Sequence, residues 1–379
     1  DLAGLSAQSL LRRGEGAPGA TTLVLSTESI PANAYAAIDN FGSQFVGPME
    51  ITAGADVLNP FGLFGRWSVQ GLTADPTNEL RYARASVALP VTGDGLTVGA
   101  SLALIEAEPG DTLATQGVRS DTTVIEATVS YPMIRSRRMN LSFDGRATWR
   151  NSQTRSLNRG IDNVDDTRVL SATASLDYAD DWAGVSIVQG TVDVGLDIFG
   201  ASPERNRSRQ DADGGYVTGG LYAARYQSLA PIGVPKAQAL VAFEGQYTID
   251  KLPSSAEFSV GGTRFGRGYD SSELSGERGF AVKAELQYTE RLDQYLGDSR
   301  VQGFVFYDFG RVYDDSTRAF FQEDGALASF GGGVRFDATE HLSGEIYAAK
   351  PLTRGRGNPR DGDDSDKDPI ILFSTTVRY

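Results

Sequence analysis

The chain has 379 residues, of which 44 are glycine, and its 49 acidic and 35 basic side chains give a formal net charge of −14. It contains no cysteine and one histidine, which excludes disulfide scaffolds, iron–sulfur proteins, thiolate zinc sites and metal centres that need several imidazoles. The acidic balance argues against nucleic-acid binding, and a hydrophobic content of 40% is too high for a disordered chain.

The first residues form a small separate unit. Residues 3–11 and 22–27 are predicted to form two short strands around the loop 12–20, followed by a linker over 28–32. A segment of about thirty residues cannot build a core of its own. We therefore interpret residues 1–32 as the end of a preceding domain, and residues 33–379 as a second domain.

From residue 33 onward, apolar and polar residues alternate with a period of two. Between residues 139 and 150, Phe143 and Trp149 fall on one face. Asp144 and Arg146 fall on the other, because successive side chains of a strand point to opposite sides. The pattern predicts an all-β fold of long strands. The sixteen predicted strands are 33–41, 47–57, 65–73, 79–90, 95–106, 120–132, 137–150, 167–179, 183–198, 216–229, 236–249, 279–290, 299–313, 325–337, 342–351 and 369–379.

The connections between these strands alternate between short and long. Short turns are expected at 59–65, 90–95, 132–138, 179–183 and 337–341. Long polar connections are expected at 107–121, 151–166, 199–215, 250–278, 314–325 and 351–368. Even strand number, long strands and this alternation are typical of a transmembrane β-barrel. Closure of the antiparallel sheet pairs every backbone group and leaves no edge in the hydrocarbon.

The polar faces of the strands are then expected to line a wet lumen of mixed charge. The alternative is a soluble sandwich whose polar faces meet solvent. The charged residues expected in the lumen are Asp144, Arg146, Asp177, Asp193, Asp197, Glu244, Lys283 and Glu285.

The most specific motif lies in the longest connection, residues 250–278, which we call the inward loop. It contains Gly261-Gly262, then Arg267-Gly268-Tyr269, and ends on Leu274 and Gly276-Glu277-Arg278-Gly279. A later strand carries Phe306, Asp308 and Gly310 in alternate positions, so that these three share one face, which we assign to the lumen. An arginine buried in a loop folded into the lumen needs a carboxylate partner, and a bidentate pair supplies both strength and geometry.

These elements resemble the TpsB transporters of two-partner secretion, a family that includes FhaC and the haemolysin activators within the superfamily of BamA. Asp39-Asn40 with Gly42, and Asn59-Pro60 with Gly62, resemble the first hairpin and first turn of the same family. The resemblance runs in order along the whole chain. It departs at Gly266, where the family usually has valine, and this change is expected to loosen the loop tip.

The resemblance implies that Arg267 pairs with Asp308 inside the lumen, and that residues 1–32 are the remnant of a POTRA domain. We call the implied contacts between loop and wall the latch; it consists of Gly261, Gly262, Gly266, Arg267, Gly268, Tyr269, Phe306, Asp308 and Gly310. Two roles stay open for it, which are plain stabilisation of the barrel and gating of the pore.

By the same resemblance, the chain is expected to be a monomeric barrel in the outer membrane of a Gram-negative cell, surrounded by lipid and lipopolysaccharide. It would secrete a TpsA-like exoprotein through its lumen without ATP. The alternative is a BamA-like insertase for outer-membrane proteins. A barrel enzyme and a passive porin are weaker readings, because His341 falls in a short turn and porins lack the Arg-Gly-Tyr loop. No cofactor, metal or nucleic acid is expected.

Other motifs are expected to be structural. Gly331–Gly333 would lie within a strand, and residues 369–379 would form the last strand, ending in an aromatic residue. Asp165-Asp166 and Asp180-Asp181 are interpreted as turn carboxylates. Asp361–Asp368 is acidic, and a solvated loop is favoured there over a calcium site.

Overall fold

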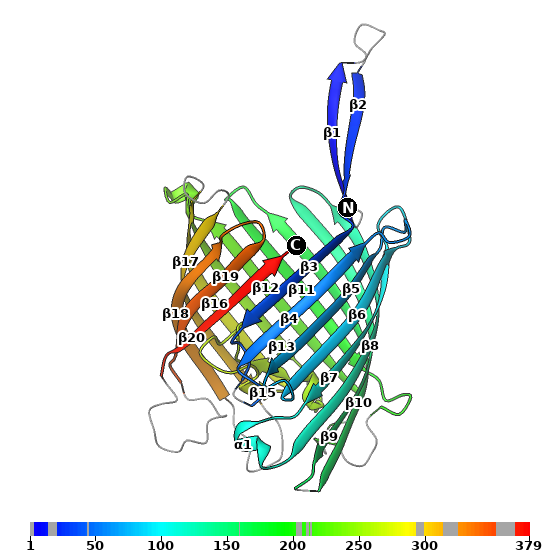
Figure 1. Cartoon of the computed structure of the whole chain (residues 1–379), viewed down its shortest axis with the longest axis vertical. Helices are drawn as coiled ribbons and strands as arrows, with labels where there is room; N and C mark the ends of the chain where they lie inside the picture. The colour runs from blue at the N-terminus through cyan, green and yellow to red at the C-terminus, as the bar shows by residue number, and fades with distance from the viewer. Residues whose placement is uncertain are drawn as a thin grey trace.

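The fold is a closed β-barrel with a separate hairpin at its N-terminus (Figure 1). The computed structural model describes residues 4–13, 21–43, 45–158, 160–201, 207–209, 212, 214–292, 299–313, 325–353 and 368–379. The sixteen barrel strands are β3 (Ala32–Asp39), β4 (Met49–Leu58), β5 (Arg66–Asp75), β6 (Leu80–Pro90), β7 (Thr97–Ala107), β8 (Val118–Arg135), β9 (Met139–Ser156), β10 (Ile161–Ala179), β11 (Gly184–Gly195), β12 (Tyr216–Ser228), β13 (Ala237–Tyr247), β16 (Arg278–Arg291), β17 (Arg300–Tyr313), β18 (Gly325–Asp337), β19 (Leu342–Pro351) and β20 (Ile370–Arg378). The predicted number and order of strands are confirmed.

The barrel closes where the last strand pairs with the first. β20 and β3 run antiparallel from Ser374 opposite Asp39 to Arg378 opposite Tyr35. Beyond Asp39 the side chain of Asn40 continues this pairing: its Nδ2 donates to the carbonyl of Ile371 at 2.9 Å, and its Oδ1 accepts from the amide of Phe373 at 2.7 Å. Asn40 thus acts like one more peptide group at the seam.

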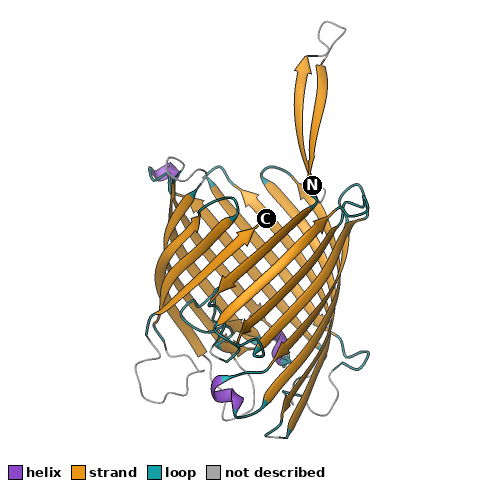
Figure 2. Cartoon of the chain, in the orientation of Figure 1, coloured by secondary structure: helices purple, strands orange, loops and turns teal. Residues whose placement is uncertain are grey.

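The two rims differ in their connections. Both ends of the barrel chain lie at the rim that carries the short turns, and the long loops gather at the opposite rim (Figure 1). Helical structure among the described residues is confined to loops and turns: α1 (Asp111–Ala114) and the 3-10 segments η1 (Ala230–Ile232) and η2 (Ser254–Ala256) (Figure 2).

One predicted connection is wrong. Residues 151–166, expected to form a long polar loop, continue β9 and β10, which pair as far as Ile161 opposite Ser156. Asp165 and Asp166 therefore lie in a strand and not in a turn. Strands β8, β9 and β10 have 18 to 19 residues, whereas about 9–11 residues span a bilayer. Their outer ends project past the neighbouring strands at the long-loop rim, and such projecting segments are polar on both faces like a loop.

The N-terminal unit is a two-stranded hairpin of β1 (Leu5–Arg13) and β2 (Thr21–Ser29), as predicted. It extends away from the short-turn rim (Figure 1). The amide of Ile30 donates to the carbonyl of Gly4 at 3.0 Å and closes the base of the hairpin. The amide of Leu58 in β4 donates to the carbonyl of Pro31 at 2.8 Å and joins this base to the barrel. Leu11 and Leu23, which pair across the hairpin, remain 69% and 63% exposed.

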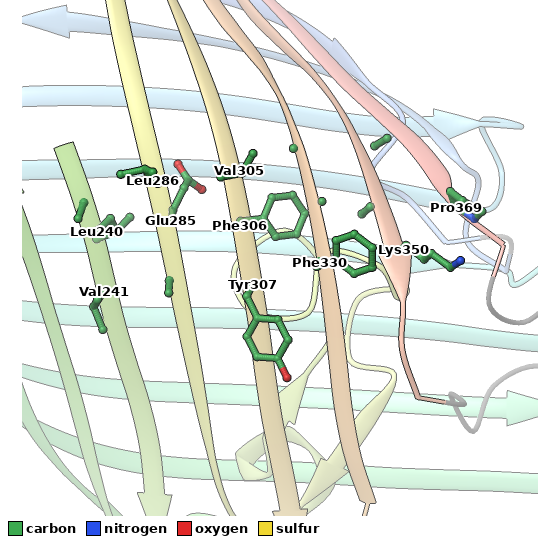
Figure 3. Close-up of a pocket in the computed structure, with 16 residues that line it drawn as sticks. Leu240, Val241, Glu285, Leu286, Val305, Phe306, Tyr307, Phe330, Lys350 and Pro369 are labelled. Carbon is green, nitrogen blue, oxygen red and sulfur yellow. The ribbon is translucent and has the colours of Figure 1, made fainter. Parts of the chain in front are cut away.

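The outer surface of the barrel is apolar. Leu170, Val192 and Val305 are among the exposed large hydrophobic residues that point outward from alternate strand positions. A groove of about 860 Å³ crosses the outside of β13 and β16 to β19 (Figure 3). Its lining includes Ala284, Leu286, Phe330 and Gly332. Among the described residues, no helix has the length and apolar character needed to cross a membrane.

Candidate functional site: the latch between the inward loop and the lumen wall

The inward loop turns back into the barrel and packs against its inner wall. Within the loop, β14 (Phe258–Val260) pairs with β15 (Leu274–Gly276) as a small sheet. Phe258, Val260 and Leu274 of this sheet are buried with Phe265 and Tyr269 of the loop. The wall side of the same cluster consists of Ala224, Leu240, Ala242, Ala281, Val312 and Leu327.

This packing corrects the expected character of the lumen. The wall was expected to offer only polar side chains, but the strip beneath the loop is apolar. Burying that strip and the facing loop residues contributes roughly 25 cal/mol for each Å² of apolar surface removed from water. The loop is therefore held by hydrophobic contact as well as by the polar latch.

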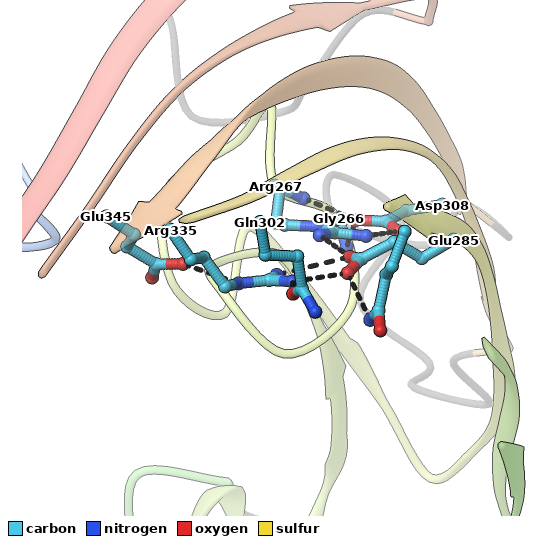
Figure 4. Close-up of polar contacts among 8 residues, drawn as sticks. Gly266, Arg267, Glu285, Gln302, Asp308, Arg335 and Glu345 are labelled. Atoms are coloured by element: carbon cyan, nitrogen blue, oxygen red, sulfur yellow. Dashed lines mark hydrogen bonds and ion pairs between the residues drawn. The ribbon is translucent and has the colours of Figure 1, made fainter. Parts of the chain in front are cut away.

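Arg267 and Asp308 form the centre of the latch (Figure 4). The guanidinium donates through Nε to Asp308 Oδ2 at 2.9 Å and through Nη2 to Oδ1 at 2.8 Å. The amides of Gly266 and Arg267 also donate to Oδ2, at 3.2 and 3.1 Å. Arg267 is 4% exposed and Asp308 is fully buried, so the structure brings together the pair that the resemblance implied, with bidentate geometry.

Arg267 also serves a second carboxylate. Its Nη1 donates to Glu285 Oε2 on β16 at 2.6 Å. Burial disfavours the charge on Arg267, but the hydrogen bonds and charges of Asp308 and Glu285 outweigh burial, so the pKa of the guanidinium lies above its ordinary value. Glu285 was expected only to line the lumen, and the structure makes it part of the latch.

Arg335 on β18 extends the latch along the wall, and the sequence analysis missed it. It donates to Glu285 at 2.5 and 3.3 Å through its two Nη atoms, and to Glu345 of β19 at 3.1 Å through Nε. Charges thus alternate in sign from Asp308 through Arg267, Glu285 and Arg335 to Glu345 (Figure 4). Arg335 lies on the lumen face of β18, next to the strand that carries Asp308, but alternation alone does not distinguish it from other lumen residues.

Aromatic rings support both arginines. The guanidinium carbon of Arg267 lies 3.5 Å from the ring centroid of Phe306, and that of Arg335 lies 3.8 Å from the ring centroid of Phe304. Tyr347 packs on both rings, with centroids 6.0 Å apart in each case. Cation–π contacts of this kind gain strength where water is excluded.

Glycines allow the loop tip to approach the wall. Gly266 has a φ of +103°, where a side chain is strained, and its amide reaches Asp308. A valine would be strained at this φ, so glycine fits the backbone conformation that brings this amide to Asp308. At Gly310 a Cβ atom would lie 2.4 Å from Val260 Cγ1. The remaining latch glycines, Gly261, Gly262 and Gly268, lie in the loop turn and at its contact with the wall.

Tyr269 joins the loop tip to the connection after β19. Its hydroxyl lies 2.8 Å from the carbonyl of Ala328 and 2.8 Å from both the carbonyl and the hydroxyl of Thr353. The amide of Thr353 donates back to it at 3.0 Å. Tyr269 thus links the inward loop to a second connection at the long-loop rim.

The other charged residues expected in the lumen occupy three settings. Glu244 pairs with Arg264 of the inward loop at 2.9 Å. Arg146 and Asp193 line an inner cavity of about 350 Å³ near the loop. Asp144 on β9 and Asp177 on β10 lie on the lumen faces of their strands. Asp197 was placed wrongly, because β11 ends at Gly195 and Asp197 lies in the following loop.

The minor motifs fall mostly where expected. Gly331–Gly333 lies in β18, His341 is exposed in the turn before β19, and Asp180 accepts hydrogen bonds from the amides of Trp182 and Gly184 in a short turn. The acidic segment 361–368 lies outside the described residues except for Asp368. No group of three or more potential metal ligands occurs in the part of the chain that the structure describes.

Comparison with known proteins gives one family. The family model for the haemolysin secretion/activation proteins ShlB/FhaC/HecB matches residues 19–336. A search of curated sequences finds no match.

Similar solved structures share this fold. CdiB from Escherichia coli has a TM-score of 0.81 at 19% identity, covering 98% of this chain and 67% of that protein. CdiB from Acinetobacter baumannii has a TM-score of 0.73 at 17% identity, covering 100% of this chain and 66% of that protein. A structure of BamA from Haemophilus ducreyi lacking POTRA domains 1–3 has a TM-score of 0.66 at 12% identity, covering 99% and 75%. This chain therefore spans about two thirds of the length of the CdiB proteins.

Proposed function

Because the chain belongs to the ShlB/FhaC/HecB family of haemolysin secretion/activation proteins, we propose that it is the outer-membrane pore through which a TpsA-like exoprotein is secreted. The observation that carries this proposal is the loop latched inside a closed barrel, with charged side chains on the wall around it. A loop docked in the lumen gives a transporter a part that can close the pore at rest, and porins lack the Arg-Gly-Tyr loop.

The transport step requires only passage and not catalysis. The exoprotein would enter unfolded at the short-turn rim and move through the lumen in extended form. Folding beyond the long-loop rim would then drive the movement, since no nucleotide is available outside the inner membrane. The polar wall away from the loop suits this passage, because it offers few apolar contacts that would hold the chain.

The inward loop must leave its docked position for a chain to pass. Docked, it fills the lumen beside β12, β13 and β16 to β18 and buries the apolar strip of the wall. Releasing the loop breaks the four hydrogen bonds that Gly266 and Arg267 donate to Asp308 and exposes the apolar strip to water. The latch therefore favours the closed state and acts as a gate.

The N-terminal hairpin is proposed to be the end of a POTRA domain on the periplasmic side. A lone two-stranded hairpin is marginal in water, and its exposed leucines favour packing against further chain. Such a domain presents strand edges to which an extended segment of the exoprotein can add. The short-turn rim, next to the hairpin, would then face the periplasm.

The apolar outer surface of the barrel supports a position in a membrane. The apolar belt fits the hydrocarbon of a Gram-negative outer membrane, and the projecting β8–β10 sheet would reach the lipopolysaccharide sugars. All sixteen strands come from one chain, which supports a monomeric pore.

The proposal is tested by secretion. The full-length protein and its exoprotein are produced together in a strain that lacks both, and release of the exoprotein is measured. We expect release to depend on the barrel. Undiminished release without the barrel would refute the proposal, whereas loss of many outer-membrane proteins on depletion would favour the BamA-like insertase.

A further inference from the structure

Lys283 is a charged residue on the lumen face of β16. It lies directly opposite Asp308 in the pairing of β16 with β17. The Cβ atoms of such cross-strand neighbours are about 4.5–5.5 Å apart, well within the reach of a lysine. Yet among the described residues no carboxylate forms an ion pair with Lys283 within 4.0 Å, and its Nζ lies 5.2 Å from the ring centroid of Phe265.

The inward loop accounts for this separation. The four donors to the Asp308 carboxylate are the amides of Gly266 and Arg267 and the Nε and Nη2 of Arg267. All four belong to the loop, and so does Phe265, which holds the ammonium of Lys283. In the docked state the loop therefore supplies all four donors to Asp308, and the ammonium of Lys283 lies near Phe265 of the same loop.

Glu285 and Asp308 differ in the hydrogen-bond donors that each would keep after the loop leaves. It keeps Arg335 of the wall, which reaches both of its oxygens at 2.5 and 3.3 Å. Among the described residues, Asp308 accepts no hydrogen bond from a cation of the wall; its donors are all in the loop. Of the two carboxylates that bind Arg267, Asp308 alone needs a replacement.

We propose that Lys283 is that replacement: when the loop is displaced, its ammonium leaves the Phe265 ring and pairs with Asp308. The inference rests on the loop displacement required by the proposed function. The latch then has two states: Asp308 pairs with Arg267 when the loop is docked and with Lys283 when the loop is displaced. Lys283 is thus a positioning residue that lowers the free-energy cost of opening without weakening the docked state.

The test uses the purified full-length protein and needs no exoprotein. Arg267→Ala, Lys283→Met and the double variant are compared with wild type. A carbodiimide joins lysine to a carboxylate in close contact, and peptide mass spectrometry reports the Lys283–Asp308 link. We expect the yield of this link to rise several-fold in Arg267→Ala.

Thermal unfolding supplies the second readout. Lys283→Met alone should change the melting temperature little, while the double variant should melt lower than the sum of the single shifts, because Asp308 then has no cation. Lys283→Arg combined with Arg267→Ala should melt like Arg267→Ala alone. Lys350→Met is the matched control, since it removes the same charge from the outer face and should be additive with Arg267→Ala.

An unchanged cross-link yield or additive melting shifts would each overturn the proposal. If Arg267→Ala does not fold, Arg267→Gln removes the charge with a smaller loss of packing and takes its place. Because neither readout involves transport, a failure of secretion leaves this result interpretable, and a failure here leaves the secretion test untouched.

Discussion

At the scale of single residues, the latch depends on the shape of one guanidinium. Arg267 donates to both oxygens of Asp308 and also to Glu285, while its face lies on Phe306. Only a planar group with several fixed donors can make these contacts at once. The motif and the lumen face of Asp308 made this pair predictable from the sequence.

We predict that Arg267→Lys loosens the inward loop although the charge is kept. A lysine ammonium cannot bridge Asp308 and Glu285 in the same way, so part of a stabilisation of about 3–5 kcal/mol should be lost. Proteinase K digestion of the protein in detergent measures this as faster cleavage within residues 250–278. Arg264→Lys is the control: Arg264 belongs to the same loop, but its side chain is 63% exposed; it pairs with Glu244 at 2.9 Å, and its guanidinium carbon lies 5.3 Å from the ring centroid of Tyr222. Equal cleavage rates for the two variants would contradict the prediction.

The contacts of Arg335 and Tyr347 with the latch were not predicted from the sequence, and the reason is physical. Each is one polar residue on a strand whose lumen face is expected to be polar, so neither stands out. Their importance arises from register, which places Arg335 beside Gln302 and Tyr347 beside Gly333, and register could not be read from alternation. The fully apolar run Ala239–Phe243 was a usable signal for the strip beneath the loop, because only a strand covered on both faces needs it.

At the scale of elements, alternation predicted the strands well within the apolar belt and failed beyond it. Inside the belt one face must be apolar, so the period of two is enforced. Beyond it both faces meet water, and residues 151–166 have the composition of a loop while forming the ends of β9 and β10. The inward loop was predictable as a unit from its length and its glycines, whereas its small sheet β14–β15 was not.

A disulfide tether tests whether this loop must move. The chain has no cysteine, and a Cβ atom at Gly310 would lie 3.2 Å from Cβ of Val260, near the ~3.5–4.5 Å of disulfides. The Val260→Cys/Gly310→Cys variant should secrete only under reducing conditions, because oxidation fixes the loop to β17. The Ser259→Cys/Ser275→Cys variant links two residues that pair within the loop and should secrete in both states. If the oxidised variant secretes as fast as the same variant after reduction, the loop can stay docked during transport.

At the scale of the whole molecule, the barrel, the docked loop and the projecting sheet β8–β10 form a structure that is asymmetric from rim to rim, and we propose that the docked loop closes its lumen at rest. Closure in one chain removes every strand edge from the hydrocarbon, so the wall is rigid and the loop is the part that can change position. The apolar strip and the charged latch then set the free energy that transport must supply.

The central claim is that the exoprotein passes through the lumen, and its most direct test is a cross-link from inside the barrel. Asp193 and Val192 are neighbours on β11 with opposite faces; Asp193 lines an inner cavity, and Val192 is 50% exposed on the outer surface. A photoreactive residue is placed at one or the other position, and an exoprotein with a tightly folded domain at its trailing end is stalled during secretion. We expect a cross-link to the exoprotein from position 193 and none from position 192. A cross-link from position 192, or none from position 193 while the stalled chain is exposed at the cell surface, would contradict it.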